Sequence, residues 1–354
     1  MILLGLYVHI PFCRRKCGYC DFYSINYDKD TAKTYVDAVK SRLSKIDKTF
    51  DTVYFGGGTP SIIGSGVADI LSAVRFSENA EITAECNPDS ATDEFLSTAA
   101  KSGVNRLSIG LQSANDSELK LLTRPHTSAD VKSAVERARM YNINNISLDV
   151  MLGFKGQTKQ SLESTIDFCA ELEVNHISAY MLKVEERTPF AKIDDISLDG
   201  DEIASLYDSC CERLSYHGYG QYEISNFAKS GFECRHNLIY WNCDDYIGLG
   251  PAAHSLYGGK RYYYERNLND FIGGCEPIFD DDFGGRDEYI MLQLRLNDGL
   301  NFSEFEKRGF SFESGFLDRC KTLEKAGLLL IKDDRISLTH KGFLVQNSVL
   351  TYLL

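Results

Sequence analysis

Apolar residues follow two alternating patterns along the first 217 positions of the chain. Short apolar runs, typical of buried parallel strands, alternate with longer stretches in which apolar residues recur every three to four positions, as on one face of a helix. The predicted strands are 3–9, 52–55, 81–84, 106–109, 145–150 and 176–182. The predicted helices are 30–46, 67–74, 93–101, 128–141, 162–172 and 201–217.

This alternation predicts an α/β fold, in which a parallel sheet is covered by helices. Right-handed crossovers between successive parallel strands curl such a sheet toward a barrel. Six strand–helix units are fewer than a closed barrel of this type requires. We therefore expect a partial, open (β/α)₆ barrel.

The pattern changes at about residue 219. Short, aromatic, turn-rich segments follow, such as 222–227 and 245–250. Beyond residue 285 come helical stretches and a hairpin pattern, in which 328–331 and 335–338 flank a polar turn. Helices followed by a hairpin resemble a small α+β winged-helix unit. The expected organisation is a partial barrel at 1–218, an aromatic-rich connecting region at 219–285 and a winged-helix-like domain at 286–354.

Composition and charge limit the classes of function and cellular location that fit this chain. The chain has 38 Lys and Arg against 51 Asp and Glu, a formal net charge of −13. Nucleic-acid binding needs a basic footprint, so this charge argues against a nucleic-acid partner. No apolar run reaches the ~18 residues of a membrane span. The apolar N-terminus lacks the basic region and cleavage site of a signal peptide, and we interpret it as a strand. Eleven cysteines, an odd number, fit a reducing cytoplasm better than a disulfide framework.

Three cysteines carry the strongest chemical signal. Cys13, Cys17 and Cys20 follow the first strand with the spacing C-x₃-C-x₂-C. Thiolates are the usual ligands of iron–sulfur clusters, and a loop this short can wrap one cubane with each cysteine on a different iron. The fourth iron is then open to a small molecule. A four-cysteine zinc site would need a second closely spaced pair, which the other eight cysteines do not offer. The alternative of three incidental thiols is disfavoured because spacing and position agree.

Further polar residues follow the predicted strands. The run 56–60, Gly-Gly-Gly-Thr-Pro, comes directly after the second strand. Glycines let a ligand approach the backbone, although the run alone is equally compatible with a tight turn. Glu85, Gln112, Arg124 and Asp149 lie at or beyond later strand ends. Because the carboxyl ends of parallel strands form the face on which α/β active sites are built, we expect these residues to line one rim.

The cysteine motif and its flanks, YVHIPFC-x₃-C-x₂-C-DF at residues 7–22, resemble the radical S-adenosylmethionine (SAM) superfamily. The closest resemblance is to its coproporphyrinogen-related branch, which contains oxygen-independent coproporphyrinogen III oxidases and haem chaperones. The resemblance implies a [4Fe-4S] cluster on Cys13, Cys17 and Cys20, with SAM on the open iron.

The same resemblance implies how SAM is held. The Gly-Gly-x-Thr-Pro segment would hold the methionyl amino group, Arg124 the carboxylate, and Gln112 and Asp149 the ribose hydroxyls. A guanidinium suits a carboxylate because it donates two parallel hydrogen bonds. Lys155 replaces the proline usual in this branch, which concerns loop shape. The implied SAM contacts are Tyr7, Tyr19, Gly57, Gly58, Thr59, Glu85, Gln112, Arg124 and Asp149, and His9 would shield the cluster.

Two features separate the groups of this branch. The oxidases have a fourth cysteine two residues after the third, whereas this chain has Phe22, as in the haem chaperones. Residues 236–241, His-Asn-Leu-Ile-Tyr-Trp, resemble the HNxxYW motif associated with haem binding in the chaperones. Imidazole is a common axial ligand of haem iron, and Tyr240 and Trp241 offer flat apolar surface. The alternative is an aromatic corner of a domain interface, with His236 hydrogen-bonded and not ligating.

Two functions therefore compete. The first is a haem chaperone, which binds haem and passes it to an acceptor protein that the sequence does not name. The second is a radical SAM oxidase, which needs an electron donor for its cluster and decarboxylates coproporphyrinogen III oxidatively. The SAM residues support both. Phe22 and the 236–241 motif favour the chaperone, as does a cluster strand that begins almost at Met1, because the oxidases carry a longer leader. Radical RNA modification is disfavoured by the charge.

Overall fold

The computed structural model describes residues 3–354, and its centre is a run of six parallel strands. They are β1 (Gly5–Ile10), β4 (Phe50–Gly57), β5 (Phe76–Cys86), β6 (Arg106–Gln112), β7 (Asn145–Leu152) and β8 (His176–Met181). Each was predicted from its apolar run. Their outward-facing residues, such as Val8, Phe55 and Leu148, are fully buried in the main hydrophobic core.

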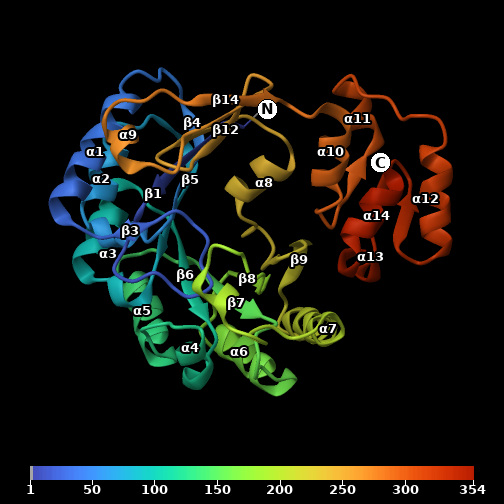
Figure 1. The fold of residues 1–354 in the computed structure, drawn as a ribbon, viewed down its shortest axis with the longest axis horizontal. Helices are drawn as coiled ribbons and strands as arrows, with labels where there is room; N and C mark the ends of the chain where they lie inside the picture. Colours follow the sequence, from blue (N-terminus) through green and yellow to red (C-terminus); the bar gives the residue numbers. More distant parts are fainter. Residues whose placement is uncertain (1–2) are drawn as a thin grey trace.

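Helices cover the convex face of this sheet (Figure 1). They are α1 (Lys29–Leu43), α2 (Gly66–Leu71), α3 (Asp93–Ser102), α4 (Asp116–Leu121), α5 (Ser128–Met140), α6 (Lys159–Glu171) and α7 (Gly200–Tyr216). Capping boxes at Thr127, Thr158 and Asp199 satisfy the free N–H groups at the starts of α5, α6 and α7. Except for the short α4, these helices were predicted, and the boundaries differ by a few residues.

Residues after 219 extend the sheet at both edges. β9 (Gly220–Glu223) and β10 (Asn226–Ala228) continue it beyond β8, and β11 (Tyr246–Leu249) pairs in parallel with β1. β12 (His254–Tyr257), β13 (Lys260–Tyr263) and β14 (Ile278–Asp282) follow as antiparallel strands. In residues 3–354 the sheet has twelve strands and its two edges, β14 and β9, do not pair, so the barrel is partial and open, as expected.

The helix α8 (Arg235–Trp241) carries the 236–241 motif and lies between the sheet and the C-terminal unit (Figure 1). The small helix α9 (Leu268–Ile272) packs near α1. No helix within residues 3–354 combines the length and the apolar character needed to cross a membrane.

The C-terminal unit has its own hydrophobic core. Phe305 lies at its centre, fully buried, with its ring stacked on Phe312 at 4.4 Å. The elements are α10 (Gly285–Gln293), β15 (Leu300–Asn301), α11 (Phe302–Lys307), α12 (Phe316–Lys325), β16 (Leu329–Lys332), β17 (Arg335–Leu338), α13 (His340–Leu344) and α14 (Gln346–Leu353). Helices and a β16–β17 hairpin form the winged-helix-like arrangement expected from the sequence, while the domain boundaries stay a prediction.

Phe305→Ala should destabilise this C-terminal core strongly. Truncating a buried phenylalanine costs about 3–5 kcal/mol because the lost contacts are not replaced. Leu317→Ala, at a position 45% exposed on the neighbouring α12, is the matched control and should change stability little. Urea unfolding followed by circular dichroism measures both. Equal midpoints for the two variants would contradict the placement of Phe305 in a packed core.

Candidate functional site

The three motif cysteines lie together at the carboxyl end of the parallel strands. Cys13 ends the short strand β2 (Phe12–Cys13), which pairs with β3 (Ile25–Asn26), and all three thiols are free and partly exposed. The Cys20 amide donates to the Cys17 carbonyl at 3.2 Å, which folds the loop back on itself. The Gly18 amide donates to Thr123 Oγ1 at 2.8 Å and ties the loop to the far side of the barrel mouth.

The cysteine loop does not present a site for a single metal ion among the described residues. Within residues 3–354 no three His, Cys, Asp or Glu side chains converge as ligands of one metal ion. In a cubane each sulfur meets a different iron, so convergence on one point is not required. Burial raises the pKa of the Cys20 thiol to about 11, and the nearby Cys17 and Cys13 add to that rise. Metal coordination would offset this cost, because it holds cysteine in the thiolate form.

The glycine run packs directly against the cysteine loop. The Gly58 amide donates to the Ile10 carbonyl at 2.8 Å, and Thr59 Oγ1 hydrogen-bonds with Cys13 Sγ at 3.5 Å. Gly57 has a φ of 105°, and a Cβ there would lie 2.5 Å from the His9 ring. The run therefore needs glycine for both its backbone conformation and its close packing. It is more than a surface turn, since it borders the expected cluster.

Two partly buried carboxyl groups, those of Glu85 and Asp149, lie close enough near the glycine run to influence each other electrostatically. Glu85 accepts hydrogen bonds from the Gly57 amide at 3.2 Å and from the Tyr54 hydroxyl at 2.9 Å. Burial raises the pKa of Glu85 to about 7, and the nearby Asp149 raises it further. Burial likewise raises the pKa of Asp149 to about 6, although Ser108 Oγ donates to it at 3.1 Å.

Arg124 joins the cysteine loop to the strand ends. Its Nη2 donates to Asn87 Oδ1 at 2.7 Å and to the Gly110 carbonyl at 3.0 Å, and its Nη1 donates to Cys17 Sγ at 3.3 Å. Its buried Nε has no partner within residues 3–354. An unpartnered guanidinium N–H is suited to donate a hydrogen bond to the carboxylate of a bound ligand, which is the role that the family resemblance implies for Arg124.

Gln112 and Asn87 complete this rim. Gln112 is buried at the end of β6 with a φ of 69°, where the β6–β7 register also shifts. Left-handed backbone at a residue other than glycine is strained and clusters at functional sites. Asn87 bridges Arg124 and Thr59, donating to Thr59 Oγ1 at 3.1 Å. The sequence analysis did not predict a role for Asn87. The feature that could have identified it is its position directly after β5 and before a proline.

The aromatic side chains beside the cysteines form an uncharged side of the site. The Tyr7 hydroxyl hydrogen-bonds with His9 Nδ1 at 3.0 Å, and His9 Nε2 with the Tyr23 carbonyl at 2.8 Å. Burial lowers the pKa of His9 to about 4, so its imidazole is neutral near pH 7. Tyr19 OH lies 3.4 Å from Arg124 Nη1. Phe22, by contrast, is 66% exposed on the loop surface.

The structure places His236 of α8 inside the barrel, with only 1% of its surface exposed. Its Nδ1 hydrogen-bonds with Thr52 Oγ1 at 2.7 Å and its Nε2 with the Tyr240 hydroxyl at 2.8 Å. The Tyr54 ring stacks on it at 5.2 Å. Both ring nitrogens of His236 are therefore hydrogen-bonded to hydroxyl groups. Trp241 lies under Arg295, whose guanidinium is 4.4 Å from the indole.

Glu81 on β5 holds the start of α8, a role that sequence reasoning missed. Its carboxylate accepts the backbone N–H groups of Arg235 at 3.2 Å and His236 at 3.1 Å. The signal was a polar residue at every second position of the strand, Glu81, Thr83 and Glu85, which predicts a polar inner face.

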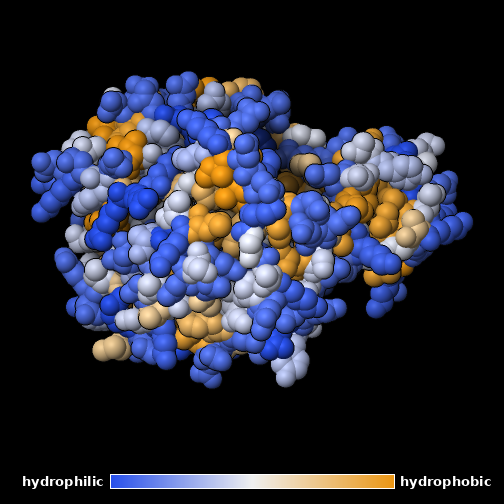
Figure 2. Space-filling model, turned by 60° about the horizontal axis from the view of Figure 1, so that its bottom comes forward, coloured by the Kyte–Doolittle hydropathy of each residue, from blue (hydrophilic) through white to orange (hydrophobic). Residues whose placement is uncertain are grey.

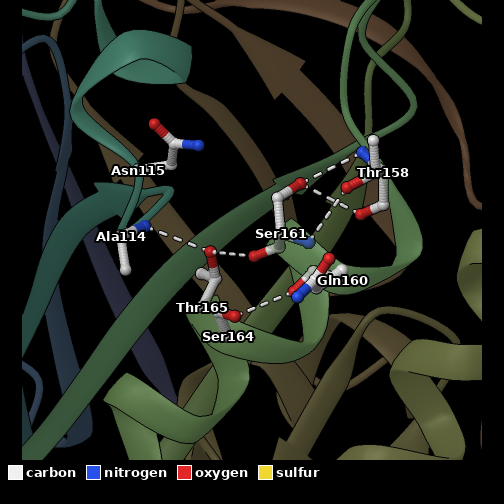
Figure 3. Close-up of a pocket in the computed structure, with 7 residues that line it drawn as sticks. All are labelled: Ala114, Asn115, Thr158, Gln160, Ser161, Ser164 and Thr165. Atoms are coloured by element: carbon white, nitrogen blue, oxygen red, sulfur yellow. Dashed lines mark hydrogen bonds between the residues drawn. The ribbon is translucent and has the colours of Figure 1, made fainter.

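A separate surface pocket of about 350 Å³ lies between the loop after β6 and the start of α6 (Figure 3). Its polar groups bond to one another: the Ala114 amide donates to Thr165 Oγ1 at 3.1 Å, and the Ser161 amide to Thr158 Oγ1 at 3.1 Å. Because these groups cap and anchor α6, the pocket offers few free donors or acceptors to a ligand.

Comparison with known families matches two parts of the chain. Residues 7–169 match the model of the radical SAM superfamily, and residues 287–345 match that of the HemN C-terminal domain. The first match spans the cysteine loop, the glycine run and the rim residues, and the second lies within the C-terminal unit.

Full-length relatives and one solved structure agree with these matches. The haem chaperone HemW of Bacillus subtilis is 35% identical over 97% of this chain and 97% of its own. HemW of Mycobacterium tuberculosis H37Rv is 32% identical over 99% of this chain and 94% of its own. The radical SAM enzyme coproporphyrinogen III oxidase (HemN) from Escherichia coli has the same fold, with a TM-score of 0.83 and 21% identity over 99% of this chain and 90% of its own.

Glu85→Gln should stabilise the SAM-free protein relative to wild type, increasingly as the pH rises. The pKa of Glu85 is raised to about 7 in the folded state from 4.5, so the folded state binds more protons between these values. Wild-type stability therefore falls as the pH rises through this window, by roughly 3 kcal/mol at most. Glutamine can accept the Gly57 hydrogen bond on its amide oxygen and donate its amide N–H to the Tyr54 hydroxyl oxygen, and it carries no charge. Urea unfolding at pH 5 and pH 8 measures the difference, and a pH-independent difference would contradict the raised pKa.

Proposed function

The chain belongs to the HemW family of the radical SAM superfamily, and from this premise we propose that it is a haem chaperone. It binds haem and delivers it to an acceptor protein. The similarity to HemW relatives over nearly the whole chain carries the proposal. Phe22 supports it, because a coproporphyrinogen III oxidase would have a fourth cysteine at that position. The eleven cysteines, all free thiols, support a cytoplasmic location.

We propose that Cys13, Cys17 and Cys20 hold a [4Fe-4S] cluster. The free thiols at one loop and the orphaned Nε of Arg124 beside them support a cluster with SAM on its open iron. Arg124 binds the SAM carboxylate, the glycine run its amino group, and Gln112 and Asp149 its ribose. When reduced by an electron donor, the cluster would supply an electron to SAM. The neutral His9 and the partly buried Tyr7, hydrogen-bonded to each other, would keep charge away from this side of the site.

The proposal predicts saturable, one-to-one haem binding by the cluster-reconstituted protein under anaerobic conditions, followed by the Soret band. The loaded protein should then pass its haem to an added apo-globin, because a chaperone must release its cargo. Binding without transfer would contradict delivery. The absence of saturable binding would contradict the chaperone function altogether and favour the oxidase, for which turnover of coproporphyrinogen III is the direct assay.

Replacing one motif cysteine should remove the cluster. Cys13→Ala, Cys17→Ala or Cys20→Ala leaves an iron without its protein ligand, and the protein should lose iron and acid-labile sulfide after anaerobic reconstitution. Cys275→Ala is the matched control, since Cys275 is a partly exposed thiol far from the motif in sequence. Iron and sulfide analysis measures both. A full complement of both elements in any motif variant would contradict the cluster assignment.

A further inference from the structure

The charge of this chain is unevenly distributed, and its most basic segment lies within the cysteine motif. The formal net charge is −13, yet residues 14–16, Arg-Arg-Lys, form the only run of three consecutive basic residues in the sequence. These are the three residues between Cys13 and Cys17, and all three are exposed. A positively charged patch therefore lies directly beside two of the proposed cluster ligands.

The contacts of the cysteine loop do not account for this charge. Arg15 has no hydrogen bond or ion pair within residues 3–354. Lys16 Nζ donates to the Phe22 carbonyl at 3.0 Å, on the surface of the loop. The guanidinium that contacts a cysteine sulfur is instead that of Arg124, whose Nη1 lies 3.3 Å from Cys17 Sγ. The basic run thus presents its charge to solvent and not to the sulfur atoms.

Acidic groups around the loop neutralise this charge only in part. Asp89 pairs with Arg14 at 3.3 Å. Asp21, the one acidic residue of the loop, already pairs with Arg187 at 3.2 Å and Arg266 at 3.7 Å. The three cations of the run and these two arginines are balanced by two carboxylates, which leaves an excess of three positive charges. An exposed excess of this sign attracts a negatively charged partner.

An exposed aromatic side chain lies beside the basic run. Hydrophilic side chains cover most of the face drawn in Figure 2, whereas Phe22 is 66% exposed and is the most exposed phenylalanine within residues 3–354. Ile25 of β3 and the nearby Tyr27 are each 37% exposed. Apolar anchors within a polar or charged rim are typical of protein-binding surfaces, and a transient redox contact needs less than about 1,200 Å² in total.

We infer that residues 14–16 and Phe22 form the docking surface for an acidic one-electron carrier protein. This inference rests on the cluster at Cys13, Cys17 and Cys20 that belongs to the proposed function. One electron passes from the reduced carrier to the cluster, so the carrier is oxidised and the cluster reduced by one electron, and no bond forms or breaks. The patch adjoins two cluster ligands, which makes the electron's path short, and its charge steers an acidic surface onto it.

The double charge reversal Arg15→Glu/Lys16→Glu tests this docking surface. The probe is a reduced [2Fe-2S] ferredoxin of strongly negative net charge, mixed anaerobically with cluster-reconstituted, full-length protein. Rapid-freeze electron paramagnetic resonance gives the rate of cluster reduction, and titration with oxidised ferredoxin gives the affinity. At low ionic strength both should fall roughly tenfold or more. Added salt should slow the wild type and diminish the difference between the two proteins.

Two controls separate docking from damage to the cluster. Reduced methyl viologen, a small cation, needs no docking surface and should reduce the double variant at least as fast as wild type. Lys325→Glu/Lys332→Glu makes the same charge change on exposed residues of the C-terminal unit and should keep nearly the wild-type rate with ferredoxin. Phe22→Ser should lower the affinity and keep the salt dependence. Because it leaves the residues between the cysteines unchanged, it tests the surface even where the charge variant loses its cluster.

The outcomes distinguish this inference from the proposed function. Unchanged ferredoxin rate and affinity in the cysteine-loop variants, or an equal loss in the C-terminal variant, would overturn the docking surface. Loss of haem transfer to apo-globin with unchanged electron transfer would overturn it too, and would assign the patch to the haem acceptor. Wild-type protein that holds no iron and sulfide after reconstitution would overturn the proposed cluster itself.

Discussion

A single buried carboxylate fixes the helix that covers the inner face of the open barrel. Glu81, on β5, accepts two backbone N–H groups at the start of α8, although 154 residues of sequence separate it from the first donor, Arg235. A buried carboxylate is costly unless it is paired and hydrogen-bonded. Here the helix supplies the hydrogen bonds, and the buried guanidinium of Arg106, on the adjacent β6, supplies positive charge. The position of the 236–241 motif follows from this interaction.

From α8 an unbroken series of contacts leads to the glycine run. His236 stacks on Tyr54 at 5.2 Å, the Tyr54 hydroxyl donates to Glu85, and Glu85 accepts the Gly57 amide. Displacement of α8 would uncover Tyr54 and break the hydrogen bonds of His236. Tyr54 and Glu85 therefore link the position of α8 to the geometry of the glycine run. The helix α8 is thus a structural partner of the glycine run 56–60.

Local patterns in the sequence were enough to predict the barrel and its rim. Each strand is a buried apolar run and each helix carries an apolar stripe, so the type and order of the elements could be predicted from the sequence. Because active sites form at the carboxyl ends of parallel strands, the sequence also predicted that Glu85, Arg124 and Asp149 lie along one rim. The extension of the sheet by β9 to β14 could not be predicted, because these strands are short and because β11, which joins β12 to β14 to the barrel, pairs with β1 across more than 200 residues. The contacts of Glu81 with α8 span 154 and 155 residues, and those of Asn87 with Thr59 and Arg124 span 28 and 37, so no local pattern encodes these partners.

The motif interpretation of His236 shows why residue type alone does not assign a ligand. A histidine, a tyrosine and a tryptophan within six residues satisfy the chemistry of haem binding, but they also satisfy the chemistry of a packed interior. Both ring nitrogens are hydrogen-bonded, at 2.7 and 2.8 Å, so ligation of iron by His236 would require one of these two hydrogen bonds to break, while the other could stay and orient the ring.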